Sequence, residues 1–368
     1  MVPHIDPRWR EWYDHRIESY RFPKGEAARL AYVLQIGQDG FTLLDALDTD
    51  LNAAHLAQLP AIQQLRLVWF QQFMRTDGVV QWRPGTAEPP SAQRSESPYD
   101  PEARYSIKRG RAWLGYKLHL TETCDPALPH LITHVQVTAA CVQDIDALPA
   151  VHQALERKVL LPTRHLVDSG YVSGSLMAQS LKDFAVELIG PPRASSSWQQ
   201  QDPHAFKINE FVIHWDEHFA VCPRGHRSSK WQTGRSKQGL PTTTISFRSG
   251  LCNRCPEKTR CTQSTRRGRS FTVQDQAGYE ALGHMRSQQE TDAWKVMYHR
   301  RAGIEGTIAV AVRAYQARTA RYRGEAKVRV QGMATAASIN LERVFAWWLE
   351  RPRATTRTAR FARLPLSA

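Results

Sequence analysis

The chain has 368 residues, of which 42% are hydrophobic and 9% aromatic, a composition that excludes global disorder. Lys and Arg total 49 against 35 acidic residues, which gives a formal net charge of +14. A surplus of this size favours a polyanionic partner such as nucleic acid, with a merely basic soluble enzyme as the alternative.

The first part of the chain, residues 1–82, is predicted to be a helical segment. Apolar residues recur at helical spacing over residues 43–47 and 62–73, which is typical of helices with one buried face. A short strand is expected at Val79–Trp82. Residues 83–98 are polar and rich in proline, so we expect them to form an exposed linker.

Residues 99–194 carry alternating strand and helix patterns. The expected elements are strands at 113–120 and 131–137, a helix at 144–160, and strands ending at Asp168 and Ile189. Such alternation predicts an α/β domain in which helices cover a mixed sheet.

The rest of the chain divides into three regions. Residues 195–271 are polar, contain a cysteine cluster, and are interpreted as an inserted β-rich subdomain. Residues 272–350 are strongly helical in pattern and are expected to complete the α/β domain. Residues 351–368 carry five arginines and no acid, which predicts a disordered basic tail.

No apolar run approaches the length that spans a bilayer, and the first ten residues lack an apolar signal core. A cytoplasmic location is therefore expected, in which cysteines stay reduced. Two of the six cysteines, Cys124 and Cys141, are isolated in sequence, and we expect them to be small core residues.

The other four cysteines cluster in the expected insertion. They are Cys222, Cys252, Cys255 and Cys261. Two cysteines with two residues between them make a good pair of metal ligands, and four thiols suit a tetrahedral structural Zn²⁺ site. Because the spacing is not that of a standard zinc finger, reduced and unligated thiols are the alternative.

Asp168 follows a short apolar strand and precedes Ser169 and Gly170. In an α/β sheet, side chains at the carboxyl end of a strand emerge into the crevice where ligands bind. Asp168 is therefore a candidate catalytic acid. The alternative is an aspartate that caps the turn after its strand.

A second acid, Glu305, shares a helix face with Tyr298 and Arg301, because these residues are spaced by three and four positions. Arg can bind phosphate oxygens with two hydrogen bonds, and a carboxylate can hold a divalent cation. Phosphodiester chemistry uses metal ions held by such carboxylates to activate the attacking oxygen and stabilise the leaving one. An ordinary solvated helix face with an Arg–Glu pair is the alternative.

At these residues the sequence resembles a known family. Asp168-Ser-Gly-Tyr171 and Tyr298-x-x-Arg301-x-x-x-Glu305 resemble the second and third acidic motifs of bacterial insertion-sequence DDE transposases. Further stretches resemble a cysteine-containing branch of that family, at residues 97–106, 108–110, 115–124, 301–307 and 321–324. The resemblance extends from about Trp9 to Leu349 and rests on the number and order of these motifs.

The resemblance implies a ribonuclease-H-like mixed sheet flanked by helices, with the cysteine-containing subdomain inserted into it. It implies an enzyme that cleaves and transfers DNA strands with Mg²⁺ or Mn²⁺ held by Asp168 and Glu305, beside Tyr298 and Arg301. It also implies a nucleoid-associated protein whose partners are the element ends, the target DNA and a second copy of the chain.

The sequence departs from the family at the first catalytic aspartate. That residue usually lies in an Asp-Ser-Thr or Asp-Gly-Thr element upstream of a segment like residues 9–74, and no such element occurs here. We therefore expect an N-terminally truncated transposase that is inactive alone or is completed by a segment encoded upstream. Asp77 and Asp100 are the available substitutes. In addition, Val312 stands where related signatures place a basic residue, and Arg313 follows it.

Basic residues flank both acidic motifs and are expected to contact the DNA backbone, with a solvated charge run as the alternative. The candidates are Lys108, Arg109, Lys117, Arg313, Arg318, Arg321, Arg323 and Lys327. Two further hypotheses about function stay open. One is a non-catalytic DNA-binding fragment or relic of a transposase, and the other is a related metal-dependent nuclease that does not join strands.

Overall fold

The computed structural model of the chain describes residues 6–13, 22–50, 52, 54–108, 110–193, 197–236 and 239–351. The chain divides into two compact units. The first unit holds Met1–Leu118, Val137–Val142 and Thr319–Gly332, and the second holds His119–Gln136, Gln143–Arg318 and Met333–Ala368. The expected basic tail lies outside the described residues except for Arg351.

The first unit begins with helices, as the apolar spacing of residues 43–47 and 62–73 predicts. A β-hairpin follows them. The helices are α1 (Arg8–Tyr13), α2 (Glu26–Thr49), α3 (Ala54–Ala57) and α4 (Pro60–Gln72), and the hairpin strands are β1 (Phe73–Thr76) and β2 (Val79–Trp82). Helix α2 approaches α4 closely at Gly40, because this residue has no side chain. A Cβ there would lie 1.9 Å from the Trp69 ring. The Trp69 indole N–H donates to the Gly37 carbonyl at 3.0 Å, so the two helices are joined by a directional bond.

The stretch at residues 83–98, expected to be an exposed linker, is mostly exposed or part-exposed and is also anchored to α4 at Ser95. Ser95 is 5% exposed, and its N–H donates to the Gln71 side-chain oxygen at 2.9 Å. The Gln71 amide in turn donates to the Ser95 carbonyl at 2.9 Å. This reciprocal pair satisfies the buried polar groups of both residues, and a polar, proline-rich composition does not reveal it.

A three-stranded sheet runs in the order β3-β4-β5, with β3 (Arg104–Lys108), β4 (Arg111–Glu122) and β5 (Ile132–Ala139). A second pair of strands, β6 (Arg164–Leu166) and β7 (Glu187–Ile189), is parallel and separate. The sequence predicted one mixed sheet, whereas the described strands form several small ones. The three-residue length of β6 and β7 allows only a short ladder of hydrogen bonds.

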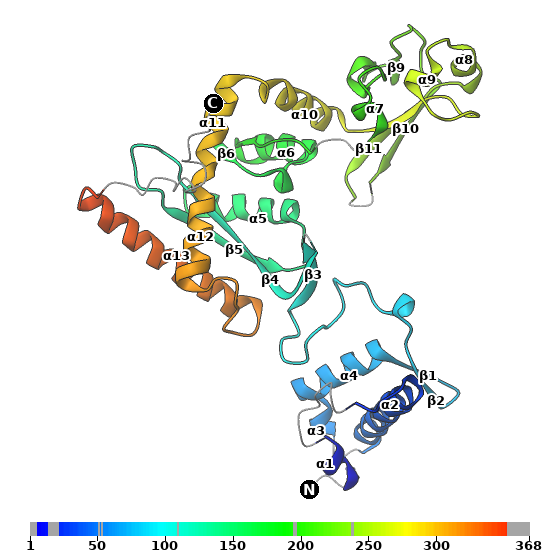
Figure 1. Ribbon diagram of the computed structural model, residues 1–368, viewed down its shortest axis with the longest axis vertical. Coiled ribbons are helices and arrows are strands. Elements are labelled where there is room, and N and C mark those ends of the chain that lie inside the picture. The colour runs from blue at the N-terminus through cyan, green and yellow to red at the C-terminus, as the bar shows by residue number, and fades with distance from the viewer. Residues whose placement is uncertain are drawn as a thin grey trace, which may run out of the picture. The chain divides into compact units, whose positions relative to one another are not determined.

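Helices pack around this parallel pair in the second unit and build its apolar core. They are α5 (Asp144–Arg157), α6 (Gly174–Phe184), α10 (Gln276–Gln288) and α11 (Asp292–His299). Leu148, Val167, Leu188 and Trp294 are among the buried residues of this cluster. Helices α6 and α10 lie side by side (Figure 1), and a Cβ at Gly174 would come within 2.0 Å of the Gly278 carbonyl oxygen. Only glycine allows the two helices to approach so closely at this point.

The expected insertion is β-rich and has its own apolar cluster, which includes Phe211, Ala220, Ile245 and Phe271. Its strands form a hairpin and a three-stranded sheet in the order β10-β11-β12. The elements are α7 (Trp198–Gln201), β8 (Val212–His214), β9 (Phe219–Val221), β10 (Lys230–Arg235), β11 (Pro241–Ser246), α8 (Ser249–Arg254), α9 (Lys258–Cys261) and β12 (Ser270–Gln274).

Two long helices close the described chain, α12 (Gly303–Tyr315) and α13 (Glu325–Trp348). Short 3₁₀ turns also occur at Gly85–Ala87, Ser169–Tyr171, Ile208–Glu210 and Arg300–Ala302, the second and the last being η4 and η6. None of the helices within the described ranges is both long enough and apolar enough to cross a membrane.

A buried pair of imidazoles in the second unit should make stability depend on pH. His152 is fully buried on α5, and its Nε2 lies 3.0 Å from the Nδ1 of His165 on β6. Burial, and then the neighbouring His152, lower the pKa of His165 to about 4, and burial also lowers the pKa of His152. Folding therefore disfavours protonation of both rings.

We predict that the free energy of unfolding falls by about 2 kcal/mol as the pH drops from about 6.5 to 4, because the unfolded chain binds protons that the folded one does not. Urea unfolding at a series of pH values measures this loss. The variant His165→Gln should flatten the curve, whereas His284→Gln, at an exposed position on α10, should leave it unchanged. An equally steep curve for His165→Gln would contradict the prediction.

Candidate functional site

Asp168 lies just beyond β6, where the backbone still follows the strand because the Val167 N–H donates to the Ile189 carbonyl at 2.8 Å. Its side chain then accepts a hydrogen bond of 2.7 Å from the Gly170 N–H and caps the turn η4. The structure thus contains the turn cap that the sequence offered as an alternative. The cap uses Oδ1 and fixes the direction of the carboxylate at the carboxyl end of the parallel pair.

A second carboxylate, Asp144, lies beside Asp168 and was not singled out from the sequence. It is the first residue of α5. A Cβ at Gly170 would lie 2.8 Å from Asp168 Oδ1 and 3.2 Å from Asp144 Oδ2, so both acids approach the same space beside the Gly170 backbone. Both carboxylates, after burial, raise the pKa of the Tyr171 hydroxyl. Asp144 starts its helix as many acids do, and that common position hid its proximity to Asp168.

Glu305 lies in the first turn of α12 and is 65% exposed at its side chain. Arg301 donates to Glu305 Oε1 at 3.2 Å from one turn earlier. The helix that the sequence predicted is interrupted here, because Arg300–Ala302 form the 3₁₀ turn η6 between α11 and α12. The pairing of Arg301 with Glu305 at four-residue spacing is nevertheless present, as either interpretation of this helix face requires.

Tyr298 connects the two acidic motifs. Its ring stacks on Trp294 with centroids 4.6 Å apart, and the Arg301 guanidinium lies 5.7 Å from the ring centroid. Burial raises the pKa of the Tyr298 hydroxyl, Arg301 lowers it, and Asp168 and Glu305 raise it further. Both acids therefore influence the same hydroxyl, although burial is the largest cause of its raised pKa.

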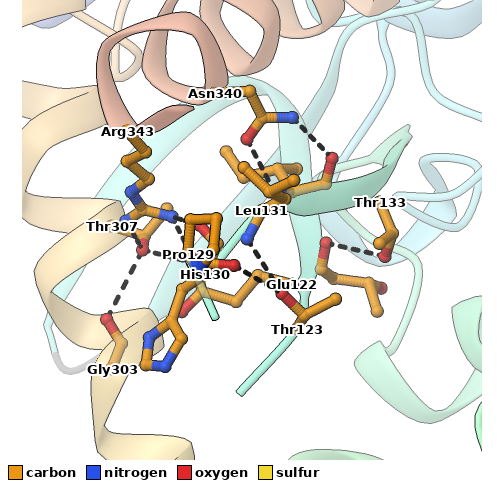
Figure 2. A network of polar contacts seen from close by, with 12 residues as sticks. Glu122, Thr123, Pro129, His130, Leu131, Thr133, Gly303, Thr307, Asn340 and Arg343 are labelled. Atoms are coloured by element: carbon orange, nitrogen blue, oxygen red, sulfur yellow. Dashed lines mark hydrogen bonds and ion pairs between the residues drawn. The ribbon is translucent and has the colours of Figure 1, made fainter. Parts of the chain in front are cut away.

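A buried network of polar side chains holds α12 in place. Glu122, at the end of β4, is 5% exposed at its side chain and accepts from the Thr307 hydroxyl at 2.5 Å. Arg343 reaches in from α13 to donate to Glu122 at 3.0 Å and also donates to the Thr307 hydroxyl (Figure 2). On the same helix, Asn340 exchanges two hydrogen bonds with the backbone of Ile132, at 2.8 and 2.9 Å. Thr307 is two residues from Glu305, so this network positions the third acidic motif.

The two aspartates proposed as substitutes for the missing first acid have other surroundings in the first unit. Asp77 lies in the exposed β1–β2 turn with a positive φ of 51°. Asp100 accepts from the Tyr116 hydroxyl at 2.8 and 3.0 Å and from the Gly324 N–H at 3.2 Å. The oxygens of Asp100 are thus engaged in tying the loop before α13 to β4.

The expected DNA-binding residues differ in exposure. Arg109 lies outside the described residues, and Lys117 is half-buried with its ammonium donating to the Val142 carbonyl at 2.6 Å. Arg323 lies 5.3 Å from the centroid of the Tyr99 ring. The exposed members are Lys108, Arg313, Arg318, Arg321, Arg323 and Lys327. Arg313 and Arg318 belong to the second unit, and Arg321, Arg323 and Lys327 to the first.

The chemistry of the acids suits a divalent metal, because carboxylate oxygens are the ligands that Mg²⁺ and Mn²⁺ prefer. Asp168 and Asp144 approach one point, and Asp168 shares the surroundings of Tyr298 with Glu305. Within the described ranges, no group of three or more His, Cys, Asp or Glu side chains is already arranged to hold a metal ion. The acids therefore fit such an ion in type and neighbourhood, and the structure shows no finished coordination sphere in this part of the chain.

A family model described as a transposase DDE domain matches residues 221–345 of the chain. The match supports a DDE transposase. It begins at the end of β9, covers the part of the insertion that contains the four cysteines and extends through Tyr298, Arg301 and Glu305 into α13. Asp168 lies before it. Neither a curated protein nor a solved structure matches the chain.

The buried ion pair beneath α12 should be worth more than a surface pair. Replacing Arg343 with Met leaves the Glu122 carboxylate buried without its cation, and we expect a loss of about 3 kcal/mol in the free energy of unfolding. Arg329→Met breaks the exposed pair with Glu325, whose side chains are 47% and 35% exposed, and should cost less than about 1 kcal/mol. Urea unfolding of both variants provides the comparison.

The double variant Glu122→Gln/Arg343→Met is the control, because it removes the buried negative charge that Arg343→Met leaves unpaired. It should recover part of the stability lost in Arg343→Met, because the buried carboxylate is then neutral. If Arg343→Met costs no more than Arg329→Met, the network does not hold α12.

Proposed function

We propose that this chain is a DNA transposase of an insertion sequence, which cleaves and transfers DNA strands using Asp168 and Glu305. The observation that carries the proposal is the transposase DDE domain match over Glu305, combined with the capped Asp168 carboxylate at the carboxyl end of the parallel strand pair. The net charge of +14 supports a polyanionic substrate. Element ends and target DNA are the proposed partners.

Each side chain has a proposed role. Asp168 and Glu305 would hold Mg²⁺ or Mn²⁺, which supplies activation of the attacking oxygen and stabilisation of the leaving one. Arg301 is proposed to give up its hydrogen bond to Glu305 and to bind a phosphate oxygen of the DNA instead. Tyr298, buried on one face by Trp294, orients Arg301 through its ring. Asp144 is proposed as an additional acid beside Asp168.

A second candidate function is DNA binding without catalysis. The observation that favours it is that the carboxylate of Asp100, one of the two available substitutes for the first acid, is engaged with Tyr116 and Gly324. The two candidates share the DNA partner and differ only in strand cleavage. A protein of the second kind would occupy the element ends and block an active transposase from them.

Strand cleavage distinguishes the two functions. The substrate is a linear duplex that carries the coding region with its natural flanking DNA, incubated with the full chain and Mg²⁺ or Mn²⁺. We expect cleavage and joining by the wild type, and a loss of at least about 100-fold in Asp168→Asn and in Glu305→Gln. Asp183→Asn, at an exposed position on α6, is the matched control and should retain full activity.

DNA binding without cleavage by the wild type would overturn the catalytic proposal in favour of the second candidate. In that event, a peptide translated from the DNA upstream of the Met1 codon is added in trans. Restored cleavage would show that a further segment completes the active site, and continued inactivity would identify a relic. Cleavage without joined products would instead identify a nuclease.

The orientation of Asp168 can be tested without removing its charge. In Gly170→Ala, the new Cβ would lie 2.8 Å from Asp168 Oδ1 and 3.2 Å from Asp144 Oδ2, so the carboxylates must shift. We predict a fall of about tenfold or more in the cleavage rate, with DNA affinity unchanged. Gly283→Ala is the control, because a Cβ there meets nothing within 4 Å. Equal activity of the two variants would contradict a catalytic role for this turn.

A further inference from the structure

The inserted subdomain brings four cysteines from three segments to one cavity. Cys222, Cys252, Cys255 and Cys261 all line it, together with Phe206, Phe247 and Arg269. All four thiols are half-buried and free of disulfides. The proposed strand-transfer chemistry uses none of them.

The backbone holds these cysteines on short, well-defined turns. Cys222 follows β9 and starts a tight turn, in which the Gly225 N–H donates to the Cys222 carbonyl at 2.8 Å and the Cys222 N–H donates to His226 at 2.9 Å. Gly225 has a φ of 79°, which favours glycine in this turn. Cys252 lies in α8, and the Cys255 N–H donates to its carbonyl at 3.2 Å. Cys261 ends α9.

A buried cation lines the same cavity. Arg269 is 7% exposed, and its Nε has no hydrogen-bond partner among the described atoms. The guanidinium acts electrostatically on the Cys261 thiol. Burying an arginine is costly unless negative charge compensates it. Four neutral thiols do not provide that charge, whereas thiolates bound to a divalent cation do, because four thiolates around Zn²⁺ carry a net charge of −2.

The subdomain also has few residues with which to hold itself together. Its buried apolar cluster has seven members, and Cys222, Cys252 and Cys261 pack directly against it. Segments with so small a core usually need a disulfide or a metal ion for stability. A metal bound by the cysteines would join the β9 turn to α8 and α9, and these to the core.

We propose that Cys222, Cys252, Cys255 and Cys261 hold a structural Zn²⁺ ion, compensated by the buried Arg269. Thiolate sulfur is the ligand that selects Zn²⁺ over Mg²⁺ or Mn²⁺, and four of them complete a tetrahedral sphere. Among the described residues, no group of three or more His, Cys, Asp or Glu side chains stands in an arrangement that could hold a metal ion. Binding therefore re-aims the thiols through their χ1 angles, which have three staggered positions, while the turns stay in place.

The test is the metal content of the full chain, purified under reducing conditions and measured by mass spectrometry. We expect about one zinc ion per chain in the wild type, and less than a tenth of that in Cys252→Ser and Cys222→Ser. Cys124→Ser and Cys141→Ser are the matched controls, because these cysteines do not line the cavity, and both should keep their zinc. Replacement by Co²⁺ should give the visible absorption of a tetrahedral thiolate complex.

The proposal is independent of the strand-cleavage site. The variant Asp168→Asn/Glu305→Gln removes the acids proposed for catalysis and should still bind zinc in full, even where it cleaves no DNA. Wild-type protein without zinc, or zinc that persists in both Cys252→Ser and Cys222→Ser, would overturn the assignment. Thiol alkylation adds a second measurement: the four cysteines should react more slowly than Cys124 until a chelator is added. Equal rates with and without the chelator would likewise overturn it.

Discussion

The buried ion pair between Glu122 and Arg343 is the interaction on which the arrangement of the second unit most depends. Glu122 ends a strand, Arg343 comes from the last helix, and Thr307 links both to α12. The Glu122 carboxylate is almost fully buried and therefore depends on Arg343 and Thr307. Removing these partners would leave a buried negative charge that water does not solvate. The network therefore fixes α12 to the sheet, and Glu305 takes its position two residues before Thr307.

Asp168 and Glu305 are positioned by different kinds of contact. Asp168 is set by local geometry, since the Gly170 N–H caps its carboxylate directly after a strand. Glu305 is set by long-range contacts through the helix that carries it. Tyr298 links the two, as its ring is held by Trp294 and its hydroxyl lies within electrostatic reach of both acids. Asp168 is thus held by its own turn, whereas Glu305 is 65% exposed at its side chain and is placed by the helix that carries it.

Sequence patterns predicted the helical start of the chain, the strands near 113–120 and 131–137 and the helix from Asp144, because the buried faces leave a clear periodicity. The ends of the elements were less predictable. Helix α5 stops at Arg157, shortly before Val159 with a φ of 57°, and β7 begins only after Ala185 with a φ of 54°. Non-glycine residues with such backbone angles depend on tertiary contacts that no local pattern contains. The proximity of Asp144 to Asp168 was missed for the same reason.

The close contact between Gly174 and Gly278 has a consequence for how this protein can change. The insertion begins after β7 and ends at β12, and helices α6 and α10 on either side of it are pressed together at these glycines. The insertion is therefore attached to one packed core at two neighbouring elements, α6 and α10. A subdomain attached in this way can lengthen, shrink or be exchanged without moving the strands and helices that carry the acids. Its surface is free to diversify while the packed core at its two attachment points stays the same.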